Sequence, residues 1–199
     1  MPPAVIDARD ITTDHAAYAA RRQEVFAHLV PLRRERRVRL GDLLALEFEN
    51  AETLRIQVQE MVYVERLTDA QAVEHEVEAY SRLLPTSHSL VATMLVELDE
   101  PDAIRDTLAD LDGIQRAIAL RVGPQTVAAV EIPGPDEDPD VPSETVSVHM
   151  LRFLLSEDQR DAFRDPAVPA AVVVDHPAYA DAAPITGATR LALLADLAL

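Results

Sequence analysis

Ser147-Val148-His149-Met150-Leu151-Arg152-Phe153 is the stretch of this 199-residue chain that most clearly indicates its fold. It lies within a strand predicted over 144–155, in which alternate residues face opposite sides of a sheet. Both faces are largely apolar, so we expect the strand to be central in its sheet and covered on both sides. His149 and Arg152 would then need partners, because an unpaired buried polar group costs roughly 2 kcal/mol or more.

Further strands are predicted on either side of this stretch. The segment 43–49 reads as one strand and 53–58 as its return, joined by a short turn at 50–52. The segment 59–66 fits either a strand or a helix. Apolar runs bounded by turn residues predict the remaining strands over 89–98, 114–122, 126–132 and 170–174.

Helices are predicted between these strands. An apolar stripe over 14–35, with Asp14 as N-cap, indicates an N-terminal helix in which Pro31 implies a kink or an early end. Start and stop signals predict four more, over 68–84, 101–111, 156–165 and 186–195. Because helices and strands mix without strict alternation, we expect an α+β fold. It would be one domain over 1–199, with a mainly antiparallel sheet, helices packed around it, a helical N-terminal segment over 1–36 and an exposed acidic loop over 133–142.

Composition excludes several kinds of chemistry. The chain has no Cys, and all 18 of its basic residues are Arg. Thiolate catalysis, Cys-bound metals, Schiff bases and lysine-bearing phosphate loops are therefore absent. The formal net charge of −17 opposes binding to nucleic acids or anionic membranes. We find no membrane-spanning run and no signal peptide, and we expect a cytoplasmic protein.

One cluster of positive charge departs from this acidic average. Five arginines fall within seven residues, and they are either a solvated helix end or a docking surface for an acidic partner or an anionic ligand. These residues are Arg33, Arg34, Arg36, Arg37 and Arg39.

A second polar island is Asp175-His176-Pro177-Ala178-Tyr179, at the end of the strand predicted over 170–174. Loops at sheet ends often carry functional groups, but an Asp before a Pro is also typical of a plain turn. If the island is functional, His176 would be a general acid or base, Tyr179 would orient a substrate and Arg152 would clamp an anion. This hypothesis requires the three side chains to converge on one pocket.

With these residues in view, the chain resembles a bacterial family of uncharacterised proteins catalogued as domain of unknown function 3501. The resemblance covers nearly the whole chain and is carried by the stretches 36–42, 48–50, 56–61, 92–94, 148–153 and 175–179. Members are similar at Glu60, His149, Arg152, His176 and Tyr179. The resemblance also implies a genomic setting beside rubrerythrin and an iron–sulfur oxidoreductase, and hence oxidative-stress or other redox physiology.

Three functions are compatible with these observations. The first is an accessory protein of a redox or metal-handling system that binds a partner, a metal or a small anion. Its partners would be rubrerythrin-like or iron–sulfur proteins, and His149 and His176 would hold iron, zinc or manganese with help from Glu60. The second is a small enzyme using His176, Arg152 and Tyr179. The third is a scaffold in which the buried His and Arg residues only fix the fold.

Overall fold

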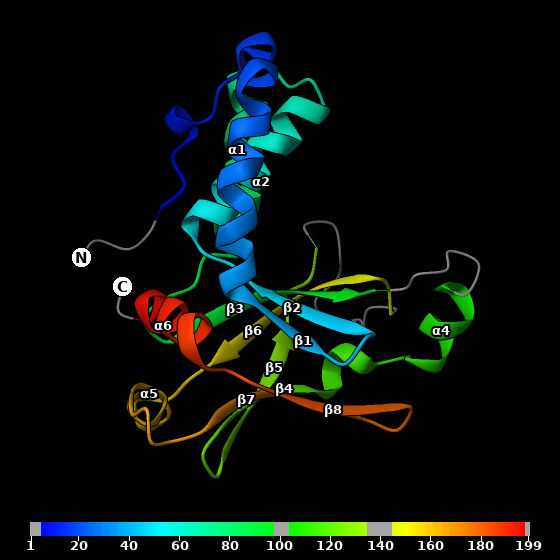
Figure 1. Cartoon of the computed structure of the whole chain (residues 1–199). Coiled ribbons are helices and arrows are strands. Elements are labelled where there is room, and N and C mark those ends of the chain that lie inside the picture. The colour runs from blue at the N-terminus through cyan, green and yellow to red at the C-terminus, as the bar shows by residue number, and fades with distance from the viewer. Residues whose placement is uncertain (1–4, 98–103, 135–144, 198–199) are drawn as a thin grey trace.

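The computed structural model describes residues 5–97, 104–134 and 145–197, so most of the acidic loop predicted over 133–142 lies outside the described residues. The described residues form an antiparallel sheet of eight strands that curls until its first and last strands lie side by side (Figure 1). In spatial order the strands are β1 (Arg37–Leu40), β2 (Leu44–Phe48), β3 (Ser89–Val96), β6 (Val148–Leu154), β5 (Gln125–Glu131), β4 (Ile118–Val122), β7 (Ala170–His176) and β8 (Tyr179–Pro184).

Three helices form a stem that rises from this nearly closed barrel (Figure 1). They are α1 (His15–Arg36), α2 (Ala51–Val64) and α3 (Ala70–Ser81). The short η1 (Ala8–Asp10) packs against α3 in the stem, and the other helical elements lie around the barrel: α4 (Ile104–Asp110), η3 (Ile114–Ala117), α5 (Glu157–Arg164) and α6 (Gly187–Asp196). None of the helices in the described part of the chain is long and apolar enough to cross a membrane. The α+β class, the antiparallel sheet and the N-terminal helix are as predicted.

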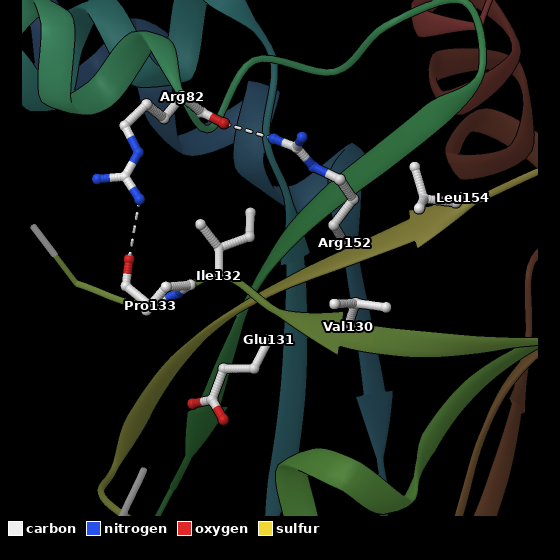
Figure 2. Close-up of a pocket in the computed structure, with 7 residues that line it drawn as sticks. All are labelled: Arg82, Val130, Glu131, Ile132, Pro133, Arg152 and Leu154. Atoms are coloured by element: carbon white, nitrogen blue, oxygen red, sulfur yellow. Dashed lines mark hydrogen bonds between the residues drawn. The ribbon is translucent and has the colours of Figure 1, made fainter. Parts of the chain in front are cut away.

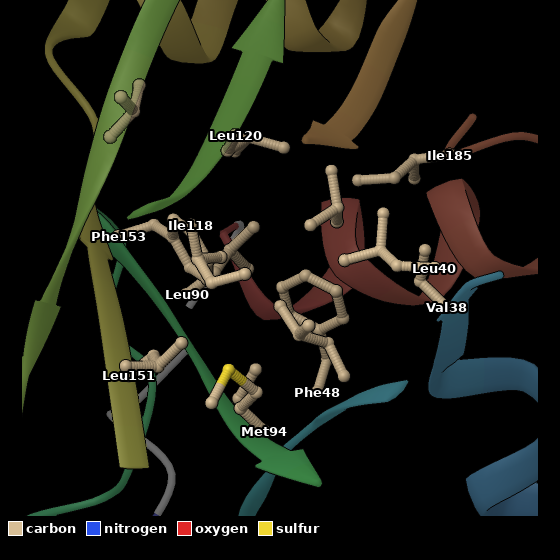
Figure 3. Packing of buried hydrophobic residues seen from close by; sticks show 14 of the residues in the cluster. Val38, Leu40, Phe48, Leu90, Met94, Ile118, Leu120, Leu151, Phe153 and Ile185 are labelled. Carbon is tan, nitrogen blue, oxygen red and sulfur yellow. The ribbon is translucent and has the colours of Figure 1, made fainter. Parts of the chain in front are cut away.

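The main core fills the inside of the barrel (Figure 3). Alternate residues of the strands point inward, and Phe48 of β2 and Phe153 of β6 meet there with ring centroids 6.0 Å apart. Two smaller apolar clusters lie outside the barrel, one between α2, α3 and β3 and the other along α2, α3 and η1. The stem is therefore attached to the outer face of the sheet by packing of its own.

Strand β6 is central, as its sequence indicates, but it is not fully covered on both faces. His149, Leu151 and Phe153 are buried inside the barrel. On the outer face, Val148 and Leu154 are 45% and 58% exposed. The stem covers only part of that face, and the remainder is open to solvent.

The segment 53–58, which we predicted as a return strand, is part of α2, so that prediction is wrong. Asn50, assigned there to a turn, is the N-cap: its side chain accepts from the backbone N–H of Thr53, and the Thr53 hydroxyl accepts from the N–H of Asn50. Leu54, Val58 and Val62 are spaced by four residues and are fully buried. The apolar residues of this segment fit both the spacing of a helix and the alternation of a strand. The helix forms because it packs its apolar residues against α1, α3 and the sheet.

Two strands were not predicted at all, β1 and β8. In β1, Arg37 and Arg39 point outward and separate the buried Val38 and Leu40, so the segment reads as part of a charged run. In β8 most side chains are small or polar. By contrast, Asp14 caps α1 as predicted, and α1 continues through Pro31 to Arg36, so the early end does not occur.

Candidate functional site

An open pocket lies on the outer face of β5 and β6, beside the end of α3 (Figure 2). Its volume is about 400 Å³, which lies within the range of small-molecule sites. The lining combines two arginines with apolar side chains and one acid: Arg82, Val130, Glu131, Ile132, Pro133, Arg152 and Leu154.

Arg152 is the central charge of this pocket. It stands opposite Val91 on β3 and Val130 on β5, and its side chain is half-buried. One Nη donates to the carbonyl oxygen of Arg82, the residue that ends α3, whereas the buried Nε has no hydrogen-bond partner. Burial, followed by the nearby charge of Arg82, lowers the pKa of Arg152. The bond to Arg82 satisfies a carbonyl at the helix end, but it leaves most of the guanidinium available.

Arg82 adds a second, exposed guanidinium at the rim. Its Nη2 reaches the carbonyl oxygen of Pro133 at a long 3.4 Å (Figure 2). The Glu131 carboxylate points away from both arginines and accepts from His149 instead. Within the described residues, neither guanidinium is paired with a carboxylate. A guanidinium stays charged and binds oxyanions through a planar fork of donors, so the pocket is suited to an anion.

His149 lies inside the barrel, and the structure gives both of its ring nitrogens a partner. Its Nε2 accepts from the backbone N–H of Val146 at 3.1 Å. Because that nitrogen must be unprotonated to accept, the proton is on Nδ1, which donates to Glu131 at 2.5 Å. This geometry is that of a neutral, hydrogen-bonded core histidine.

His176 and Tyr179 lie at the β7–β8 turn, and neither lines the pocket that contains Arg152. His176 contacts the carbonyl oxygen of Asp112 through Nε2 at 3.0 Å and accepts from the N–H of Ala178 through Nδ1 at 3.3 Å. The Tyr179 hydroxyl donates to Leu40 at 2.7 Å. The convergence that the enzyme hypothesis required is therefore not present in this pocket.

Glu60 is on α2, in the stem. It accepts from the Tyr18 hydroxyl at 2.5 Å and from Arg22, whose Nη2 is 2.8 Å away. Burial favours its neutral form, but the bonds from Arg22 and Tyr18 outweigh this and lower the pKa of Glu60. The structure does not bring Glu60, His149 and His176 together, and no group of three His, Asp or Glu in the described part of the chain is placed to hold a metal ion.

The arginines of the cluster at 33–39 are mostly engaged within the protein. Arg36 forms a buried bidentate pair with Asp196 of α6, at 2.7 and 3.0 Å. The exposed Arg34 is the member without a carboxylate partner among the described residues. The remaining arginines of β1 and of the end of α1 form ion pairs with two neighbouring acids. These pairs are Arg33–Glu47, Arg37–Glu47, Arg37–Glu97 and Arg39–Glu97.

Two polar features were not predicted from the sequence, one in the pocket and one outside it. Arg82 lies within the helix predicted over 68–84 and carries no motif, so only the fold brings it to Arg152. The second is Glu49, 2% exposed, whose carboxylate accepts from Thr53 at 2.5 Å, Thr93 at 2.6 Å and Gln57 at 3.1 Å. These neutral donors come from α2 and β3, so Glu49 ties the stem to the sheet.

The family model described as "Protein of unknown function (DUF3501)" matches residues 5–197. The chain belongs to this family. A crystal structure of a novel protein of unknown function from Burkholderia pseudomallei K96243 is similar to it, with 32% sequence identity and a TM-score of 0.83, over 92% of this chain and 94% of that one. Among curated proteins there is no match. The relationship therefore places the fold in a DUF3501 family that has no assigned activity.

Proposed function

We propose that this DUF3501 protein is an accessory protein that binds a small anion in the pocket of Arg152 and Arg82. One observation carries the proposal: the half-buried guanidinium of Arg152 has an unpartnered Nε, lies beside a second arginine and has no carboxylate partner among the described residues. Among the described residues, the half-buried charge of Arg152 beside the charge of Arg82 has an electrostatic cost that a bound anion removes.

The lowered pKa of Arg152 supports the same interpretation. Its cause is burial together with the charge of Arg82, and both would be offset by an anion between the two groups. The guanidinium of Arg152 has five N–H donors, and the bond to the carbonyl oxygen of Arg82 uses only one of them.

We also retain the hypothesis that the protein acts in redox physiology with rubrerythrin-like or iron–sulfur partners. This part of the proposal is supported by the family resemblance alone. The proposal leaves out the metal, because Glu60, His149 and His176 lie in three separate hydrogen-bond networks. The arginine cluster at 33–39 is not part of the proposed binding surface either, since its pairs are internal.

The test is to titrate isotope-labelled protein with sodium acetate and with sodium phosphate at constant ionic strength. Binding is monitored through the amide chemical shifts of the protein. We expect saturable shifts around Val130–Ile132 and Leu154. Arg82→Gln should weaken binding at least about tenfold, corresponding to one lost charged hydrogen bond. This variant removes a charge but keeps the backbone carbonyl that Arg152 uses.

Arg152→Gln is the second variant, and its folding is checked by circular dichroism. The matched control is Arg121→Gln, which removes one exposed arginine from β4, outside the pocket. Absence of saturable shifts for both anions in the wild-type protein, or equal affinities in Arg82→Gln, Arg152→Gln and wild type, would overturn the proposal.

A further inference from the structure

The anion pocket has apolar walls that a bare inorganic ion would leave unused. Val130 and Leu154 line it and are 55% and 58% exposed, among the most exposed large apolar side chains of the described chain. Exposed apolar side chains gathered at a pocket indicate what the ligand buries.

The register fixes how these side chains lie around the charge. Val130 is paired directly with Arg152 across β5 and β6, and Leu154 lies two residues further along β6 on the same face. In Figure 2 the two apolar side chains lie on one side of Arg152 and the end of α3 on the other. A ligand whose charged end meets Arg152 can therefore extend its other end over Val130 and Leu154.

We infer that the ligand is a small carboxylate with a short apolar tail, the carboxylate on Arg152 and Arg82 and the tail on Val130 and Leu154. This inference rests on the proposed function. A pocket of about 400 Å³ accepts a ligand of this size. The two guanidiniums are the cationic side chains of the lining, and the planar fork of each can bind both oxygens of a carboxylate.

The experiment is a titration calorimetry series with acetate, butyrate and hexanoate at constant ionic strength. Affinity should rise by up to about fourfold for each methylene that the pocket buries. Leu154→Ser should flatten this rise, so that hexanoate gains less over acetate than it does in the wild-type protein. The control is Val148→Ser, on the same face of β6 and 45% exposed but outside the pocket, which should keep the full rise.

Each outcome has one meaning. If acetate binds in an Arg82-dependent manner but hexanoate binds no tighter, the inferred apolar tail of the ligand is wrong and the proposed binding of an anion is retained. If phosphate at equal concentration binds more tightly than hexanoate, the ligand class is wrong. A pentapeptide with a free C-terminal leucine is the remaining arm: tighter binding than hexanoate would assign the pocket to a protein chain end and overturn the inference. Failure of every anion would remove the proposed function itself.

Discussion

The hydroxyl of Tyr179 on β8 donates a 2.7 Å hydrogen bond to the carbonyl oxygen of Leu40 at the end of β1. This bond joins the two edge strands of the sheet, which have no backbone ladder between them. Gly41, directly after Leu40, has φ of +56°, and a Cβ there would overlap the Tyr179 hydroxyl. The bond and the glycine therefore form one structural unit that completes the barrel.

Gly41→Ala should destabilise the protein by about 2–3 kcal/mol, the sum of left-handed backbone strain and the displaced hydrogen bond. Gly187→Ala is the control: its φ is +54°, but nothing lies within 4 Å of the added Cβ, so it should cost only about 1 kcal/mol. In a Tyr179→Phe background the Gly41→Ala cost should fall towards the control value, as measured by urea unfolding. An unchanged cost in that background would contradict the coupling.

The buried pair Arg36–Asp196 fastens the end of α1 to α6, with both side chains about 5% exposed. Arg36→Met should cost about 3–5 kcal/mol, because it leaves the Asp196 carboxylate buried without its partner. The double variant Arg36→Met/Asp196→Leu should recover most of that loss. Arg34→Met, at the exposed neighbouring arginine, should be neutral in the same unfolding measurements. A double variant no more stable than Arg36→Met would show that the pair itself is not the cause.

The hydrogen bonds of His149 predict one tautomer. Imidazole nitrogen spectra at neutral pH should show the proton on Nδ1, since Nε2 accepts from Val146. His149→Leu should destabilise by about 1–3 kcal/mol, because it leaves Glu131 and the Val146 amide without this partner. Glu131→Gln should preserve the tautomer, since its carbonyl can still accept. Finding the proton on Nε2 in the wild type would refute the assigned network.

We expect Glu60 to make the contribution of the stem to the free energy of unfolding depend on pH in the acidic range. Its folded pKa lies below the ordinary value of 4.5, so its stabilisation is complete above that value and is lost as the pH falls through the folded pKa. The stability difference between wild type and Glu60→Gln should be constant from pH 7 to about pH 5 and should shrink at lower pH. Glu24→Gln, at an exposed acid on α1, serves as the control for loss of one carboxylate from the stem. A difference that grows on acidification would contradict the sign.

Much of the fold could be predicted because local signals and tertiary structure agree. Ser156 and Gln159 form the capping box that starts α5, and Gly123-Pro124 turns β4 into β5. The stem helix α2 was missed because Leu54, Ile56 and Val58 satisfy a strand pattern and a helix pattern at once. Only burial against α1 and α3 separates the two.

The site was predictable in part. Arg152 was identified because a charge inside an apolar strand needs a partner, but its neighbour Arg82 comes from 70 residues away. His149 was identified by the same argument and proved to be saturated by Glu131 and Val146. A sequence shows which side chains need partners; whether the fold supplies them from within the protein depends on contacts between distant segments.

The alternation of β6 limits how this protein can change over time. His149 faces the barrel and Arg152 faces the stem and the pocket, so a single inserted or deleted residue between them would put both side chains on the same face of the strand. Either the arginine would enter the apolar interior or the histidine would move to the outer face, depending on which flank kept its register. This strand can therefore accept substitutions, but the number of residues between His149 and Arg152 cannot change.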